Sequence, residues 1–214
     1  ETVSYPELGF ERMDTVVERL PVIRESHSET RGMAPCSFCG VFRRQGLNRL
    51  AERVGADVMA LGHNLDDMAQ TVLMNMQKGD IERTLRLAPH TDAPIEGLAP
   101  RVVPMRWIPE QEVHACAMAL GLSFFHDECP YAPGALRQRN REMVSRLEED
   151  VPGSRHGLVH MVDAVKELEK KAKMAGVDDF RPLLPTPCPN CGSPTSGEIC
   201  KACEFSAMID DAAQ

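Results

Sequence analysis

Three C-x-x-C pairs constrain this 214-residue chain more than any other feature of its sequence. Two of the pairs stand close together near the C-terminus, in the stretch CPNCGSPTSGEICKAC, where Gly192 and Gly197 allow tight turns. Four thiolates at this spacing can close a tetrahedron around Zn²⁺, and sulfur in all four positions indicates a structural site and not a catalytic one. The alternative is four free thiols in a disordered tail. The four cysteines are Cys188, Cys191, Cys200 and Cys203.

Composition limits the class of protein. Hydrophobic residues make up 43% and charged residues 26% of the chain, which is typical of a globular protein with one main domain and a small appendage. No apolar run approaches the roughly 20 residues of a membrane span, and the start does not resemble a signal peptide. We therefore expect a cytoplasmic protein with no membrane contact, in which paired cysteines bind metal rather than form disulfides. The net charge of -8 argues against broad adhesion to nucleic acid but leaves a local basic face open.

Alternating strands and helices predict an α/β fold with a parallel sheet. Strands are expected at residues 2–5, 57–62 and 122–128, with helices from about Cys39 to Val54, over 65–76 and over 109–120. Five prolines between residues 87 and 109 predict a loop with a short extended piece. Two helices with apolar stripes starting at Leu136 and Leu158 follow, and a proline-rich linker precedes the cysteine tail.

The first pair, Cys36 and Cys39 in PCSFCG, does not complete a metal site alone. Two other cysteines remain in the chain. Cys116 lies on an apolar helical stripe, which predicts a small core residue. Cys129 follows a predicted strand, and strand ends in open parallel sheets meet ligands. Cys129 is therefore the better third ligand.

The turn GHNLDD, residues 62–67, joins a predicted strand to a predicted helix. Gly62 would let a ligand approach the backbone, and a helix N-terminus attracts anions. Equally, Asn64 can cap the helix while Asp67 reaches back to it, as in a capping box. The residues alone leave both interpretations open.

Three stretches together resemble one family: residues 35–75, the pair VVPMRWIPEQEV and FFHDECPYA, and the final double C-x-x-C. They are similar to the tRNA 2-thiouridine synthetases of the TtuA/TtcA superfamily, especially the archaeal and eukaryotic cytosolic subgroup, over nearly the whole chain. The resemblance implies a partial PP-loop ATP pyrophosphatase (HUP-like) sheet, C-terminal helices and a C-terminal zinc ribbon. The domains would be 1–135 with the Fe-S site, 136–180 as a helical extension and 181–214 as the zinc-ribbon tail.

The resemblance also implies a tRNA-uridine 2-sulfurtransferase. ATP with Mg²⁺ would adenylate the C2 oxygen of a tRNA uridine, with the subgroup pointing to the wobble base, and sulfide would displace AMP. Cys36, Cys39 and Cys129 would hold a [4Fe-4S] cluster with one iron free of protein ligands. Further implied partners are tRNA, a sulfur donor such as a thiocarboxylated ubiquitin-like protein, and a second copy in a homodimer. The implied ATP-site residues are Arg43, Gly62, His63 and Asp67, of which Asp67 is catalytic together with the three cysteines.

One departure from the family concerns the phosphate-binding loop, Ser-Gly-Gly-x-Asp-Ser, which this sequence does not contain. Since the chain also begins with Glu1, we expect an N-terminally truncated piece that is inactive alone, or else a degenerate homologue. The alternative hypothesis is that the protein is not an enzyme but a zinc-ribbon scaffold that binds RNA or protein.

Contact with tRNA is the expected role of an arginine cluster in RQRNREMVSR. Arg137 and Arg141 share one helix face by their spacing, with Arg139 beside them. A solvated helix face is the alternative interpretation.

Overall fold

The computed structural model describes residues 3–87, 89, 98–124, 129–133, 135–177 and 185–213. Contacts divide the chain into two units, each described by itself. Unit 1 comprises Glu1–Met59, Ala93–Pro100 and Leu183–Gln214, and unit 2 comprises Ala60–Asp92 and Arg101–Pro182. The three-part division expected from the sequence stays a prediction.

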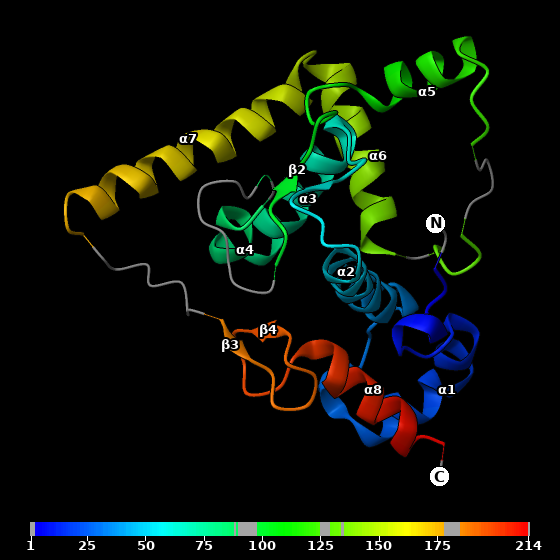
Figure 1. The fold of residues 1–214 in the computed structure, drawn as a ribbon. Coiled ribbons are helices and arrows are strands. Elements are labelled where there is room, and N and C mark those ends of the chain that lie inside the picture. Colours follow the sequence, from blue (N-terminus) through cyan, green and yellow to red (C-terminus); the bar gives the residue numbers. More distant parts are fainter. Residues whose placement is uncertain are drawn as a thin grey trace. The chain divides into compact units, whose positions relative to one another are not determined.

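Unit 1 packs the start of the chain against its end. Helix α8 (Lys201–Asp211) lies against α1 (Met13–Ser26) and α2 (Pro35–Arg53), as Figure 1 shows. Short 3-10 turns, η1 (Pro6–Leu8) and η2 (Ser28–Thr30), flank α1. The side chains of all three helices form one core, so the C-terminal tail is part of a larger hydrophobic cluster. The cluster includes Val16, Leu20, Ile23, Phe38, Phe42, Phe205, Met208 and Ile209.

A β-hairpin carries the first two cysteines of the tail. Strands β3 (Thr186–Pro187) and β4 (Pro194–Thr195) pair antiparallel. The turn between them contains Gly192 at φ 74°, a left-handed conformation that favours glycine, so its predicted role in a tight turn is confirmed.

Unit 2 is built around α3 (Leu65–Lys78), which packs on α6 (Leu136–Asp150) and α7 (Ser154–Met174). Figure 1 shows α7 as a long helix beside α6 and the short α4 (Ile81–Leu85). The residues at the centre of this packing are apolar and buried, as the helical stripe over 65–76 predicted. They are Leu65, Met68, Ala69, Val72, Val144, Val159 and Val162.

The described residues contain one small parallel pair, β1 (Met59–Ala60) and β2 (Arg101–Val102). The backbone N–H of Met59 donates to Pro100 O at 2.7 Å, and that of Leu61 donates to Val102 O at 2.8 Å. From the first bond to the second, the donor and the acceptor both move two residues toward the C-terminus, which is the pattern of a parallel ladder. The predicted strand at 57–62 and the short extended piece predicted within the proline-rich loop are thus confirmed, although each is short.

The strand predicted at residues 2–5 is wrong for residues 3–5, and residue 2 lies outside the described residues. Pro6 follows this stretch directly, fixes its own φ near the helical value and opens η1, so the chain turns there. Residues 122–124 of the third predicted strand are not in a strand, and 125–128 lie outside the described residues.

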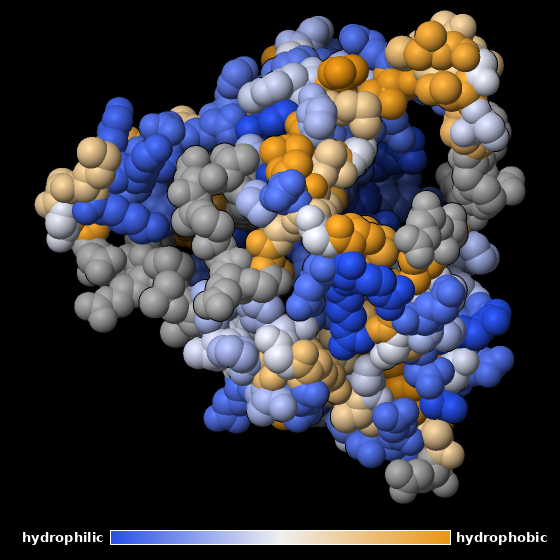
Figure 2. Space-filling view, viewed as in Figure 1, coloured by the Kyte–Doolittle hydropathy of each residue, from blue (hydrophilic) through white to orange (hydrophobic). Residues whose placement is uncertain are grey.

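The prediction of Cys116 as a core residue is also wrong. Cys116 is exposed on α5 (Glu110–Ala119), which has no buried residue. Figure 2 shows a hydrophobic surface over α5, where Met118 is 60% and Leu120 67% exposed. An apolar stripe predicts which face of a helix could be buried, but in unit 2 that face of α5 has no covering element among the described residues. No helix in the described part of the chain has the length and apolar character of a membrane span.

Candidate functional site

The four tail cysteines come together as their spacing predicted. Their sulfur atoms all lie within 4.8 Å of one another, and Cys191 Sγ is 3.6 Å from Cys200 Sγ. Sulfurs that surround a tetrahedral zinc with bonds of about 2.3 Å lie roughly 3.8 Å apart, so this quartet needs only a small contraction to hold the metal. Cys188 and Cys200 are buried, and the other two are partly covered. The geometry fits a structural metal site.

Backbone N–H groups stabilise negative charge on this quartet. The N–H of Cys200 donates to Cys188 Sγ at 3.3 Å, and this contact is the main cause that lowers the pKa of Cys188 to about 6. Burial among neighbouring sulfurs raises the pKa of Cys203. Closely packed thiolates repel one another, and a bound dication relieves that repulsion. A dication bound here would favour the thiolate form of all four cysteines.

The first cysteine pair occupies the first turn of α2. Cys36 is exposed, whereas Cys39 is half-buried, with its sulfur 3.4 Å from the hydroxyl of Tyr5. Burial first, and then the contact with Cys39, raises the pKa of Tyr5 to about 12. The hydroxyl thus keeps its proton at neutral pH and can donate it in a hydrogen bond to a Cys39 thiolate.

Phe38, which lies between the two cysteines, points into the core of unit 1. Its ring packs on that of Phe205 in α8, with centroids 4.2 Å apart and planes at 33°. Phe205 follows Cys203 by two residues. The two cysteine motifs of unit 1 are therefore joined by one aromatic contact, which no local sequence signal indicated.

The capping box before α3 is confirmed. Asp67 N donates to Asn64 Oδ1 at 3.0 Å, and Asn64 N donates to Asp67 Oδ2 at 3.2 Å. The second carboxylate oxygen, Asp67 Oδ1, is 3.5 Å from Arg137 Nη1. The cap occupies one oxygen of Asp67 and leaves the other beside a guanidinium, on a side chain that is about a third exposed.

Gly62 is exposed in the loop after β1, and His63 is partly covered. A Cβ atom built on Gly62 would meet only the Met105 methyl, at 3.8 Å, which is an ordinary contact. The surrounding protein therefore does not itself require glycine here. A requirement for it would have to come from something that approaches this backbone.

The arginine cluster of α6 makes contacts within the protein. Arg137 donates to Gln70 Oε1 and Thr71 Oγ1, and Arg141 pairs with Glu110 at 2.8 Å. Arg139 is exposed. Their predicted contact with tRNA stays a prediction, and for Arg137 and Arg141 it would compete with these acidic and polar partners.

Sequence reasoning missed an ion network under the turn. Asp66, beside Asp67, is buried and pairs with Arg155 at 3.0 Å, with both side chains less than 15% exposed. Asp66 Oδ2 also accepts from Glu110 N at 2.7 Å, and Glu148 accepts from Arg155 N at 2.9 Å. These groups adjoin a cavity of about 350 Å³ that is further lined by Gln111, His114, Arg141 and Ser145. The separation of Asp66 from Arg155 along the chain explains why no local pattern could reveal the pair.

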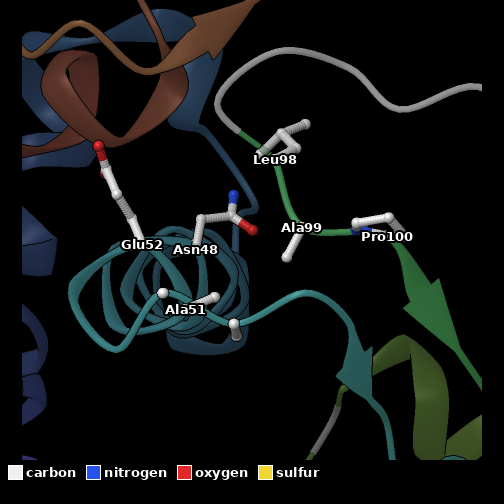
Figure 3. A pocket seen from close by; sticks show the side chains of 8 residues that line it. Asn48, Ala51, Glu52, Leu98, Ala99 and Pro100 are labelled. Carbon is white, nitrogen blue, oxygen red and sulfur yellow. The ribbon is translucent and has the colours of Figure 1, made fainter.

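A second cavity, of about 260 Å³, lies in unit 1 between the C-terminal half of α2 and residues 98–100 (Figure 3). Figure 3 shows Asn48 and Glu52 beside its apolar wall. None of its lining residues is a predicted site residue. The wall comprises Ala51, Ala56, Leu98, Ala99 and Pro100.

The predicted site residues divide between the units. Unit 1 contains Cys36, Cys39, Arg43 and the tail quartet. Unit 2 contains Gly62, His63, Asp67, Cys129 and the three arginines. Arg43 and Cys129 are both exposed. The convergence of the three cluster cysteines, and of the ATP-site residues, thus stays a prediction.

No protein-family model matches the sequence, but curated proteins do. A tRNA 2-thiolation protein NcsA from Haloferax volcanii is 36% identical over 98% of this chain. By homology, this chain is a relative of the tRNA 2-thiolation proteins. A cytoplasmic tRNA 2-thiolation protein 1 from Bos taurus is 38% identical over 97% of the chain. The chain spans 63% and 55% of the length of these two relatives.

The fold agrees with a solved structure of the family. The U34-tRNA thiolase NcsA from Methanococcus maripaludis, solved with its [4Fe-4S] cluster, matches with a TM-score of 0.57 and 38% identity. The match covers 64% of this chain and 45% of that one. Like the sequence relatives, this thiolase extends well beyond the region that the chain matches.

Proposed function

We propose that this chain is part of an ATP-dependent tRNA-uridine 2-sulfurtransferase and carries its cluster ligands. The observation that supports this most is the combined sequence and fold match to a U34-tRNA thiolase with a [4Fe-4S] cluster. The substrate is then a tRNA uridine, namely the wobble base. The three cluster ligands would be Cys36, Cys39 and Cys129.

The proposed reaction is a substitution at carbon. The C2 oxygen of the uridine attacks the α-phosphorus of ATP, and pyrophosphate leaves with Mg²⁺. Sulfide then attacks C2, the C–O bond breaks, and AMP leaves, so that 2-thiouridine is formed without any change of oxidation state. When bound, a cluster with three protein ligands supplies one iron that is open to an external sulfur ligand.

Each predicted ATP-site residue has a task in this proposal. Arg43 would neutralise phosphate charge, and Gly62, which has space beside it, would admit the nucleotide against the backbone. His63 would border the nucleotide. Asp67, with one oxygen outside the cap, would position Mg²⁺ or polarise the uridine. This sequence contains no Ser-Gly-Gly-x-Asp-Ser phosphate-binding loop, so we expect the chain alone to bind ATP weakly.

The remaining parts of the proposal concern the tail and the partners. Zn²⁺ would bind the tail quartet as a structural metal, since all its ligand positions are filled by sulfur. The sulfur donor would be a protein or small molecule that delivers sulfide, such as a thiocarboxylated ubiquitin-like protein. A cytoplasmic location and a homodimer complete the proposal.

Anaerobic reconstitution with iron and sulfide tests the cluster. The wild-type chain should bind four irons per chain, as expected of a [4Fe-4S] cluster, and gain the broad visible absorption of such a cluster. Cys129→Ala should lose both, whereas Cys116→Ala, which removes another exposed thiol of unit 2, should keep them. Zinc content should be equal in all three proteins. Zinc binding without iron in the wild type would instead support the zinc-ribbon scaffold.

A further inference from the structure

We propose that the C-terminal metal site positions the first cysteine pair through the contact between Phe205 and Phe38. Both rings are buried, at 4% and 0% exposure, and they touch face against face at a tilt. Phe38 lies directly before Cys39 in the chain. A shift of the Phe38 ring would therefore move the backbone that carries both cysteines.

The first turn of α2 lacks a capping side chain. Its N-cap residue is Ala34, which offers no side-chain acceptor to the first N–H groups of the helix. A helix end without a capping side chain frays more easily. The tertiary restraints at this turn include packing of Phe38 into the core and the Tyr5 contact with Cys39. The position of the pair thus depends on what packs against Phe38.

On the other side of the contact, the start of α8 is tied to the tail quartet. Cys200 is the N-cap of α8, and its sulfur accepts from Cys203 N at 3.4 Å. A metal at these sulfurs would fix the first turn of α8, from which Phe205 projects onto Phe38. The metal would thus fix the start of α8, α8 would hold the Phe205 ring, and that ring would hold Phe38 and the cysteine pair beside it. All of these parts lie within unit 1.

This inference rests on the proposed function only in one respect, namely that Cys36 and Cys39 bind a [4Fe-4S] cluster. The restraint itself can be measured without a cluster, by the rate at which iodoacetamide alkylates Cys39 in the zinc-loaded chain, with peptide mass spectrometry as the readout. Phe205→Ala should accelerate alkylation of Cys39 roughly tenfold, since local opening then governs access. Cys116, which is exposed in unit 2, should react at an unchanged rate.

A matched control separates the ring contact from general loosening. Met208→Ala truncates another buried side chain of α8, one turn further from the quartet. At conditions where both variants are equally destabilised, Met208→Ala should leave the Cys39 rate near that of the wild type. Equal acceleration in the two variants would overturn the proposal. Phe205→Leu refills part of the volume of the Phe205 ring and should restore most of the protection of Cys39 against alkylation. It keeps the test decisive if Phe205→Ala fails to fold.

Two further measurements complete the test. Removal of the tail metal from the wild type with a chelator should accelerate Cys39 alkylation as Phe205→Ala does, and an unchanged rate would overturn the proposal. After reconstitution, Phe205→Ala should bind less iron than Met208→Ala, and equal iron would contradict it. If the wild type binds no iron while the difference in alkylation persists, the proposed function fails and the restraint stands.

Discussion

The hydroxyl of Tyr5 lies 3.4 Å from the sulfur of Cys39, which joins the start of the chain to the first cysteine pair. When Cys39 ligates the proposed cluster as a thiolate, it can only accept in this hydrogen bond, and Tyr5 would be the donor. Hydrogen bonds to ligating sulfurs withdraw electron density and raise the reduction potential of a cluster.

Tyr5→Phe should therefore lower the midpoint potential of the reconstituted cluster while iron content stays unchanged. Anaerobic redox titration followed in the visible range measures this. Because Phe keeps the ring and removes only the hydroxyl, folding should be preserved. A potential equal to that of the wild type would show that the hydroxyl does not bond to the ligating sulfur.

The cap and the chemistry proposed for Asp67 can be separated by two neighbouring substitutions. Asn64→Ala removes the side-chain acceptor for Asp67 N and should lower the free energy of unfolding by about 1 kcal/mol. Asp67→Asn keeps an oxygen for Asn64 N but loses the charge, so it should be less destabilising. If Asp67 acts in thiolation, Asp67→Asn should nevertheless reduce 2-thiouridine formation far more than Asn64→Ala. If Asn64→Ala reduced 2-thiouridine formation more than Asp67→Asn, Asp67 would serve only to cap the helix.

The buried pair of Asp66 and Arg155 should show strong coupling. Asp66→Ala leaves the Arg155 guanidinium buried beside Glu148, which lies 3.8 Å away, and should cost about 3–5 kcal/mol of unfolding free energy. Asp66→Leu combined with Arg155→Met removes both charges and should cost less than Asp66→Ala alone. Urea denaturation of Asp66→Leu, Arg155→Met and the double variant gives the coupling energy. Additive losses would mean that the pair is not coupled.

The pH dependence of stability should contain a contribution from Glu148. Its two oxygens accept from Gly153 N and Arg155 N, both at 2.9 Å, and the bond from Arg155 N is the chief cause that lowers its pKa below the usual value. A carboxyl with a lowered folded pKa stabilises the fold above its unfolded pKa of about 4.3, and that stabilisation is lost as the pH falls through the folded value. Glu148→Gln should flatten this part of the profile in urea denaturation between about pH 2 and pH 6. An unchanged slope would show that Glu148 titrates alike in both states.

The sequence predicted those parts of the fold that depend on local signals. The cap at Asn64 and the apolar stripe of α3 are encoded within one segment, as is the spacing of the tail quartet. The helix α1 was not predicted, because Pro21 lies within it and breaks the usual pattern. Helix α8 was also not predicted, since its first turn is shared with two metal ligands.

Contacts between distant segments could not be predicted. The exposure of Cys116 depends on which elements cover α5, and periodicity carries no information about that. Arg155 reaches Asp66 from 89 residues away, and Phe205 reaches Phe38 from the other end of the chain. In the candidate site, sequence therefore identified ligand types and spacing, but not the side chains that support them.

Helix α8 presents sulfur ligands at its start and Phe205, Met208 and Ile209 along its buried face. A molecule synthesised while zinc is scarce would leave that face loosely attached, and exposed apolar side chains are what cellular quality control removes. We expect the half-life of the protein to shorten in zinc-starved cells, which pulse-chase measurement would show. Supply of the proposed structural metal would in this way set the amount of the folded protein.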